Sequence, residues 1–494
     1  MNTVAMKQDT LEAVSNLIER RLGLHFPSER HDVLARGLER GGTEMGFADS
    51  EACAIRLLAT GITPAEQDTL ALALTVGETY FFREPAALKA LEEHVLPELI
   101  AVRGKSGERR IRMWSAGCCT GEEAYTLAIM LTRLIPSLTE WDITILATDI
   151  NPDSLRKARV GRYREWSFRG APAWLKTGYF SKSASDEYEL AERVRQMVSF
   201  SYLNLVDDVY PSLVNNTSAM DVILCRNVMM YFSADRAKLV AGRFHRALLD
   251  GGWLVMSPSE GCAGSSALFA RASFDNASLY RKSGAVAVPV LPPYVLSATD
   301  QMGACVITGS PQARPPGSDV IRTISLPTAH SESPLATAAA AYACADYEAV
   351  LEIAATLPEP AVPVLVLAAR ACANLGRLDE ALAWCRTALE RDKLHASVHH
   401  LQATVLVAKH DEPAALEALK RVLYLEPHSV LAHFTTANLM LQTGEPAKAM
   451  KYFRKTMSLL RALDDSAVVP DSDGMTAERL KVMVKHIQES LART

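Results

Sequence analysis

The chain has 494 residues, and at roughly 150 residues per domain this length predicts about three domains. Apolar residues make up 49% of the sequence, which excludes a broadly disordered protein. The net charge of −5 argues against a general polyanion binder, although a local basic patch is compatible with it.

The nine cysteines show neither the spacing of a zinc site nor that of a disulfide framework, so no metal site is predicted. The first residues carry charges where a signal peptide is apolar, and no apolar run is long enough to span a membrane. These features predict a cytoplasmic protein without membrane insertion.

Residues 1–84 have the pattern of a small bundle of short helices. Apolar residues such as Leu11, Val14 and Ile18 recur at helical spacing, and Gly23 and Pro64 separate the helical segments. An N-terminal helical domain is therefore expected here.

Residues 85–282 alternate short apolar runs with amphipathic segments. This alternation predicts a mostly parallel sheet with helices on both faces. The polar and aromatic stretch 161–196 interrupts the pattern and indicates an inserted subdomain or a long loop. Strands are expected at 111–115, 143–149, 197–203, 221–225 and 253–257, and helices at 122–134 and 233–249.

Residues 283–335 are rich in Pro, Gly, Ser and Thr, which is typical of a linker. Residues 336–494 contain an internal repeat, because Gly376, His410 and Gly444 follow one another at intervals of 34 residues. This period resembles that of tetratricopeptide repeats and predicts an α-solenoid, with a polar capping helix at about 475–492. An irregular helical bundle is the alternative.

Two features of the middle region point to an adenosyl-type ligand. Gly117 and Gly121 lie between a predicted strand and helix, where they allow a sharp turn and close approach of a ligand. Asp149 ends the next strand, where a carboxylate can accept hydrogen bonds from ribose hydroxyls. Asp149 alone would equally suit the N-cap of the following helix. Both features lie at the carboxyl edge of the predicted sheet.

Five motifs occur in a diagnostic order. They are TYFFR (79–83), WSAGCCTGEE (114–123), ATDI (147–150), NL (204–205) and CRNVMMYF (225–232). Over about residues 10–282 the sequence resembles the CheR-type protein-glutamate methyltransferases of bacterial chemosensory systems. The resemblance implies an S-adenosylmethionine-dependent Rossmann-like domain, with 161–196 as a small β-subdomain. It also implies methylation of glutamate side chains on the cytoplasmic helices of chemoreceptors, with S-adenosylhomocysteine as the second product.

The resemblance also assigns roles to individual residues. Arg83 and Tyr231 match residues beside the reacting methyl group. The alternatives are that Arg83 only binds the cofactor and that Tyr231 only packs. Gly77 departs from the family, because many members have Asn at this position. The implied cofactor contacts are Thr79, Arg83, Glu123, Asp149, Asn204, Leu205, Arg226 and Asn227.

The repeats predict protein interaction: receptor docking, another signalling protein, or control of the methyltransferase domain. The repeats show no strip of aromatic residues with a basic groove, so nucleic acid is not an expected partner. Two rival functions are a catalytically inactive scaffold and a methyltransferase acting on a small molecule or RNA. The complete motif set argues against the first, and the TYFFR and CRNVM motifs give no support to the second. Arginines of the N-terminal region either face acidic receptor helices or are solvated charges; they are Arg20, Arg21, Arg30, Arg36 and Arg40.

Overall fold

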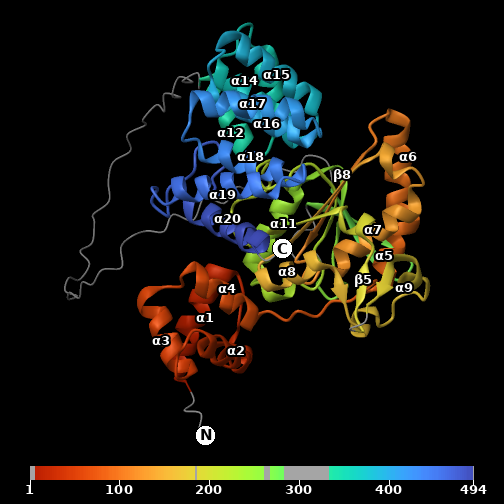
Figure 1. Cartoon of the computed structure of the whole chain (residues 1–494), viewed down its shortest axis with the longest axis vertical. Helices are drawn as coiled ribbons and strands as arrows, with labels where there is room; N and C mark the ends of the chain where they lie inside the picture. The colour runs from red at the N-terminus through yellow and green to blue at the C-terminus, as the bar shows by residue number, and fades with distance from the viewer. Residues whose placement is uncertain (1–5, 184–185, 261–267, 283–332, 493–494) are drawn as a thin grey trace, which may run out of the picture.

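The computed structural model describes residues 6–183, 186–260, 268–282 and 333–492. Three groups of elements lie beside one another: N-terminal helices, a mixed sheet with helices on both faces, and C-terminal helical repeats (Figure 1). The predicted fold class is confirmed. Nearly all of the predicted linker, 283–335, lies outside the described residues.

The N-terminal helices have ends that the sequence encodes. Gly23 ends α1 with a φ of 80°, a left-handed conformation that glycine adopts without a steric penalty. Thr63 and Glu66 form a capping box at the start of α4, in which each side chain accepts from the other's backbone N–H. Residues such as Val14 and Leu38 fill a core that belongs to this group. The elements are α1 (Gln8–Leu22), η1 (Ser28–Arg30), α2 (His31–Glu44), α3 (Ser50–Thr60) and α4 (Pro64–Leu74).

The central sheet has the strand order β6-β2-β1-β7-β8-β10-β9 within the described residues. The first five strands in this order are parallel, and they are the five that the sequence predicts. The antiparallel β9–β10 hairpin was missed, because exposed residues such as Arg271 interrupt its apolar pattern. Strand β8 starts earlier than predicted, and a register irregularity in its pairing with β7 falls in this early part. The strands are β1 (Arg110–Ala116), β2 (Asp142–Asp149), β6 (Val198–Tyr202), β7 (Met220–Leu224), β8 (Leu248–Val255), β9 (Phe269–Phe274) and β10 (Ala277–Lys282).

Helices cover both faces of the sheet, as predicted. Successive residues of β1 point to opposite sides: Met113 packs in a cluster with Leu127 of α7, and Trp114 packs in a cluster with Phe244 of α11. The helices around the sheet are α5 (Pro85–Ala90), η2 (Leu91–Val95), α6 (Leu96–Ser106), α7 (Glu122–Leu134), η3 (Leu138–Glu140), α8 (Pro152–Val160), η5 (Met229–Tyr231) and α11 (Ala234–Ala247).

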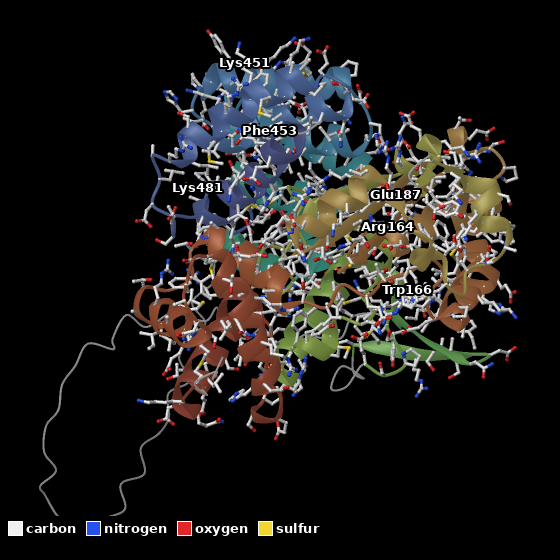
Figure 2. The ribbon with its side chains drawn as sticks, turned by 60° about the horizontal axis from the view of Figure 1, so that its bottom comes forward. Arg164, Trp166, Glu187, Lys451, Phe453 and Lys481 are labelled. Carbon is white, nitrogen blue, oxygen red and sulfur yellow. The ribbon has the colours of Figure 1, made fainter. Side chains whose placement is uncertain are left out.

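The stretch 161–196 forms a small subdomain around a three-stranded antiparallel sheet of order β3-β5-β4. Fully buried Phe81 of the TYFFR motif packs against it, with its ring 4.9 Å from that of Tyr163 and 5.2 Å from that of Phe168. Arg164 and Trp166 are exposed on this subdomain, and Glu187 is half-buried and pairs with Arg164 at 3.4 Å (Figure 2). Its elements are β3 (Arg162–Tyr163), η4 (Glu165–Phe168), α9 (Trp174–Tyr179), β4 (Phe180–Lys182), β5 (Tyr188–Leu190) and α10 (Glu192–Arg195).

The C-terminal helices pack as antiparallel pairs, and the 34-residue period has a backbone cause. Gly376, His410 and Gly444 each lie in the turn inside a pair and have φ values of 74°, 55° and 75°. A left-handed residue is therefore needed once per repeat, and glycine meets that need at two of the three turns. The helices are α12 (Pro334–Ala343), α13 (Tyr347–Thr356), α14 (Val362–Asn374), α15 (Leu378–Arg391), α16 (Ala396–Ala408), α17 (Glu412–Leu425), α18 (Val430–Gln442), α19 (Pro446–Leu460) and α20 (Ala477–Ala492).

The repeat turns contact the amino edge of the central sheet. A Cβ atom on Gly376 would lie 3.4 Å from the Cβ of Ala219, so this turn packs closely just before β7. His410 Nε2 lies 2.8 Å from Asp142 Oδ1 at the start of β2. The repeats are therefore packed against the sheet rather than suspended beyond the linker.

Within the described residues, no helix combines the length and apolar character needed to cross a bilayer. The described residues likewise contain no group of three or more His, Cys, Asp or Glu side chains placed to hold a metal ion.

The His410 contact predicts a pH-dependent stability. The hydrogen bond with Asp142 raises the pKa of His410, so the contact stabilises the fold below the ordinary histidine pKa and fades as pH rises through the raised value. His410→Gly removes the contact but relieves left-handed strain of about 1 kcal/mol. The melting temperature of wild type relative to His410→Gly should therefore be higher near pH 5.5 than near pH 9.

Asp142→Asn provides the control for this measurement. In that background the difference between His and Gly at position 410 should lose most of its pH dependence, because the carboxylate partner is gone. An equal difference at both pH values with Asp142 intact would contradict the prediction.

Candidate active site

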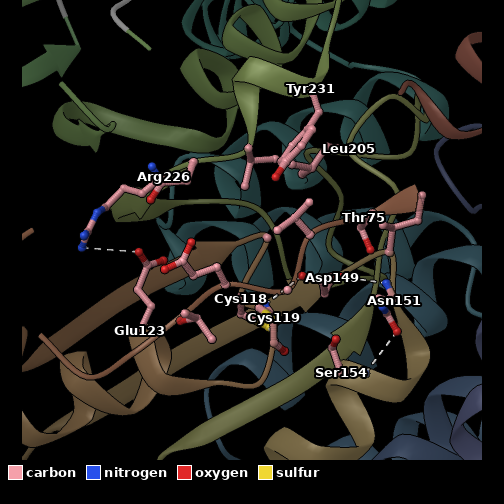
Figure 3. A pocket seen from close by; sticks show the side chains of 18 of the residues that line it. Thr75, Cys118, Cys119, Glu123, Asp149, Asn151, Ser154, Leu205, Arg226 and Tyr231 are labelled. Atoms are coloured by element: carbon pink, nitrogen blue, oxygen red, sulfur yellow. Dashed lines mark hydrogen bonds and ion pairs between the residues drawn. The ribbon is translucent and has the colours of Figure 1, made fainter. Parts of the chain in front are cut away.

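A pocket lies at the carboxyl edge of the parallel strands, where the chain crosses from β1 to α7 and from β2 to α8 (Figure 3). The sequence-predicted residues all line it, although they come from five separate segments. In Figure 3, Glu123 and Arg226 lie at one end of the pocket and Asn151 and Leu205 at the other. The predicted residues brought together are Thr79, Arg83, Glu123, Asp149, Asn204, Leu205, Arg226, Asn227 and Tyr231.

Two glycines form the turn between β1 and α7. Gly117 has a φ of 85°, and a Cβ atom there would clash with the side chain of Val228. Gly121 has a φ of 93°, and its Cβ would lie 2.9 Å from that of Ala158. Side chains are therefore excluded at both positions, which allows the tight turn that brings Gly117, Cys118 and Cys119 to the pocket.

Asp149 organises the two turns on which the pocket is built. Its Oδ2 accepts from the N–H of Cys119 at 2.8 Å, and its Oδ1 accepts from the N–H of Asn151 at 2.8 Å. Burial raises the pKa of Asp149, and these backbone N–H groups oppose that rise. The N-cap of α8 is Asn151, so the alternative role of Asp149 as that cap is wrong.

Arg226 is the buried cation of the pocket, with 2% of its side chain exposed. Its Nη1 lies 3.5 Å from Glu123 Oε2, and its Nε lies 3.5 Å from Glu84 Oε2. It also donates a hydrogen bond to the carbonyl of Arg83. Burial raises the pKa of Glu123, and the charge of Arg226 and the hydroxyl of Ser115, 2.7 Å away, oppose that rise.

Two further carboxylates, Glu84 and Glu260, escaped the sequence analysis. Glu84 accepts from Ser257 Oγ at 2.7 Å and from Asn227 Nδ2 at 3.2 Å. Glu260 accepts from the N–H of Asn227 at 2.8 Å, which holds that residue at a φ of 59°. Both acids hold Asn227, which lines the pocket, in place. No local pattern marks them, since their partners are distant in sequence.

The N-terminal helices complete the pocket, which the sequence did not reveal. Leu22 and Leu24 line it beside Asn204, whose Nδ2 donates to the carbonyl of Arg21 at 3.1 Å. The N–H of His25 donates to the carbonyl of Tyr231 at 2.7 Å. The start of the chain thus forms one wall of the pocket.

The segment 75–84 contributes to the pocket lining and includes Gly77, where the sequence departs from the CheR-type pattern. A Cβ on Gly77 would lie 3.4 Å from Cys119 Sγ, so a larger residue would need little adjustment there. The carboxylate of Glu78 lies 2.9 Å from Arg169 of the subdomain, and its carbonyl accepts from Arg83. Burial raises the pKa of Cys119 to about 12, so this thiol stays protonated near neutral pH.

Five parallel strands with a glycine-containing turn at their carboxyl edge are typical of a Rossmann-like nucleotide-binding fold. Residues 77–277 match the family described as CheR methyltransferase, SAM binding domain. Residues 362–393 and 400–458 match tetratricopeptide repeats. Chemotaxis protein methyltransferase 2 of Vibrio cholerae is 38% identical over 210 residues, which cover 42% of this chain and 71% of that protein.

The chain therefore belongs to the CheR family of chemotaxis protein methyltransferases and carries C-terminal tetratricopeptide repeats. A relative with similarity across both parts is the probable biofilm formation methyltransferase WspC of Pseudomonas aeruginosa. It is 26% identical over 438 residues, which cover 88% of this chain and 95% of that protein. The WspC protein of Pseudomonas putida is 27% identical over 435 residues, with 88% and 95% covered.

The buried Arg226 should be a large stability determinant. Arg226→Gln leaves Glu84 and Glu123 without their cation and should lower the free energy of unfolding by about 3 kcal/mol. Adding Glu123→Gln should cost less than the sum of the two single changes, because the two side chains interact. Urea-induced unfolding measures all three variants.

Arg36→Gln is the matched control for the Arg226 variant. It breaks an ion pair with Asp32 whose side chains are 65% and 60% exposed, and should change stability by less than about 1 kcal/mol. A similar small effect of Arg226→Gln would contradict the central role of this buried cation.

Proposed function

We propose that the protein transfers a methyl group from S-adenosylmethionine to glutamate side chains on the cytoplasmic helices of chemoreceptors. The observation that carries the proposal is the meeting of all the family-matched residues in one pocket. Family membership supports the methyltransferase reaction, and the motifs at 79–83 and 225–232 support the glutamate substrate.

The pocket fits this cofactor. Asp149 suits the ribose hydroxyls, and Asn204 and Leu205 line the same pocket. At the other end, Asn227 Oδ1 is buried without a hydrogen-bond partner among the described residues and is available to the ammonium group. When bound, S-adenosylmethionine supplies a methyl group that its sulfonium has already activated.

The remaining chemistry is mainly positioning. A glutamate carboxylate is ionised and nucleophilic at neutral pH, so a strong base is not required. In our proposal, Arg83 maintains a positive field that keeps the substrate carboxylate ionised, and the hydroxyl of Tyr231 orients it. Alignment of this kind contributes roughly 7–11 kcal/mol in favourable cases.

The repeats suggest interaction with other proteins of a signalling pathway. The two WspC relatives, which are similar along most of this chain, are named for biofilm formation. We therefore take a chemoreceptor of a surface-associated pathway as the first substrate to test, with chemotaxis receptors second.

The test uses the full chain, methyl-labelled S-adenosylmethionine and purified receptor cytoplasmic fragments. Methanol released from the receptor by alkali is the expected product, because carboxyl methyl esters are base-labile. Absence of label together with absence of cofactor binding by calorimetry would favour the inactive-scaffold alternative. Label on RNA but not on protein would favour the alternative of a methyltransferase that acts on a small molecule or RNA.

Arg83→Ala should reduce kcat by at least about 100-fold while changing the Kd for S-adenosylhomocysteine by less than about threefold. The reason is that Arg83 acts on the carboxylate that is being methylated. Tyr231→Phe removes only the hydroxyl. It should lower kcat if the hydroxyl orients the substrate, and should leave kcat unchanged if Tyr231 only packs. An unchanged kcat with weaker cofactor binding in Arg83→Ala would reduce this residue to a cofactor ligand.

A further inference from the structure

The C-terminal helix α20 does more than cap the repeats. It lies between the repeat array, the edge of the sheet and the N-terminal helices (Figure 1). Its residues Leu480 and Val484 are fully buried in a core shared with Phe453 of α19, and Val482 packs on the core that contains Tyr202 of β6. The predicted polar cap is therefore a buried junction between the three parts of the chain.

The first turn of α20 makes an ion pair with the pocket's supporting turn. Arg479 Nη2 lies 3.0 Å from Asp207 Oδ1, and the two side chains are 35% and 21% exposed. The N–H of Asp207 donates to the carbonyl of Asn204 at 3.0 Å and closes a four-residue turn. Asn204 and Leu205, which begin this turn, line the cofactor pocket.

The same turn is also held by the end of α1. Asn204 Nδ2 donates to the carbonyl of Arg21, and Gly23 lies so close to Val206 that a Cβ would clash with it. Arg21 Nη2 is itself 3.8 Å from Glu478 Oε1, next to Arg479. The turn is thus enclosed by the N-terminal helices and the C-terminal helix.

Helix α20 also supports the strand that leads into this turn. The ring of His486 stacks on Tyr202 with centroids 4.8 Å apart and an interplanar angle of 28°. Tyr202 is the register partner of Asp149 in the β2–β6 pair. The helix therefore contacts both the last residue of β6 and the turn that follows it.

From these contacts we propose that Arg479 is a positioning residue for the cofactor site, acting through Asp207 on the Asn204–Leu205 turn. Through this ion pair the repeat-bearing end of the chain is coupled to cofactor binding. The inference rests on the proposed function, because it takes the pocket as the S-adenosylmethionine site. Its physical basis is that a turn already ordered by Arg479 loses less conformational entropy when ligand binds.

The test measures S-adenosylhomocysteine binding to full-length variants by calorimetry. Arg479→Gln should raise the Kd about tenfold, the usual effect of removing a charged hydrogen bond that supports a binding residue. In the methylation assay the KM for S-adenosylmethionine should rise while the KM for the receptor fragment stays unchanged. Asp207→Asn should have the same effect, and the double variant should be no weaker than either single one.

Two further variants separate positioning from a general loss of structure. Arg479→Lys keeps the charge and should recover part of the affinity. Lys481→Gln is the matched control on the same helix, because Lys481 pairs at 2.6 Å with Asp465, in the segment before α20 (Figure 2). It should bind S-adenosylhomocysteine like wild type, because its partner Asp465 lies outside the turn that supports the pocket.

Wild-type affinity in Arg479→Gln, or an equal loss in Lys481→Gln, would overturn the positioning role. A wild-type protein that fails to bind S-adenosylhomocysteine at all would instead overturn the proposed function, and this inference with it. Measuring wild type first therefore distinguishes the two failures.

Discussion

The buried guanidinium of Arg226 is the interaction on which the geometry of the site depends. A cation with so little exposure must be neutralised within the protein, because its desolvation is otherwise very costly. Its partners, Glu84, Glu123 and the carbonyl of Arg83, come from the segment 75–84 and from the start of α7. Neutralising this one charge therefore fixes the segment 75–84 against the sheet and shapes one end of the pocket.

The repeats are bound to the rest of the chain by contacts at two opposite edges of the sheet. At the amino edge, the repeat turn at His410 meets the start of β2. At the carboxyl edge, α20 meets the end of β6 and the turn that supports the pocket. The repeats are therefore in direct contact with the methyltransferase domain. A partner that binds the repeats can act on that domain through these contacts, in addition to docking.

Much of this architecture is legible in the sequence, since its determinants are local. Strands β1 and β2 follow from apolar runs, α7 follows from its period and its preceding glycines, and the repeats follow from one left-handed residue in each turn. The order of the motifs also predicted which residues would meet in the pocket, through the family resemblance that it carries. The β9–β10 hairpin did not emerge, because its strands have mixed polarity and depend on pairing with β8.

The sequence by itself determined the class of fold, the repeat period and nine of the residues that line the pocket, because short-range patterns and ordered motifs encode them. Only the tertiary structure decided which groups hold those residues. Glu84, Glu260, Leu22 and Arg479 are adjacent to the site through packing alone. A buried charge or an enclosed turn takes its partners from wherever the chain folds back, and that choice leaves no local signature.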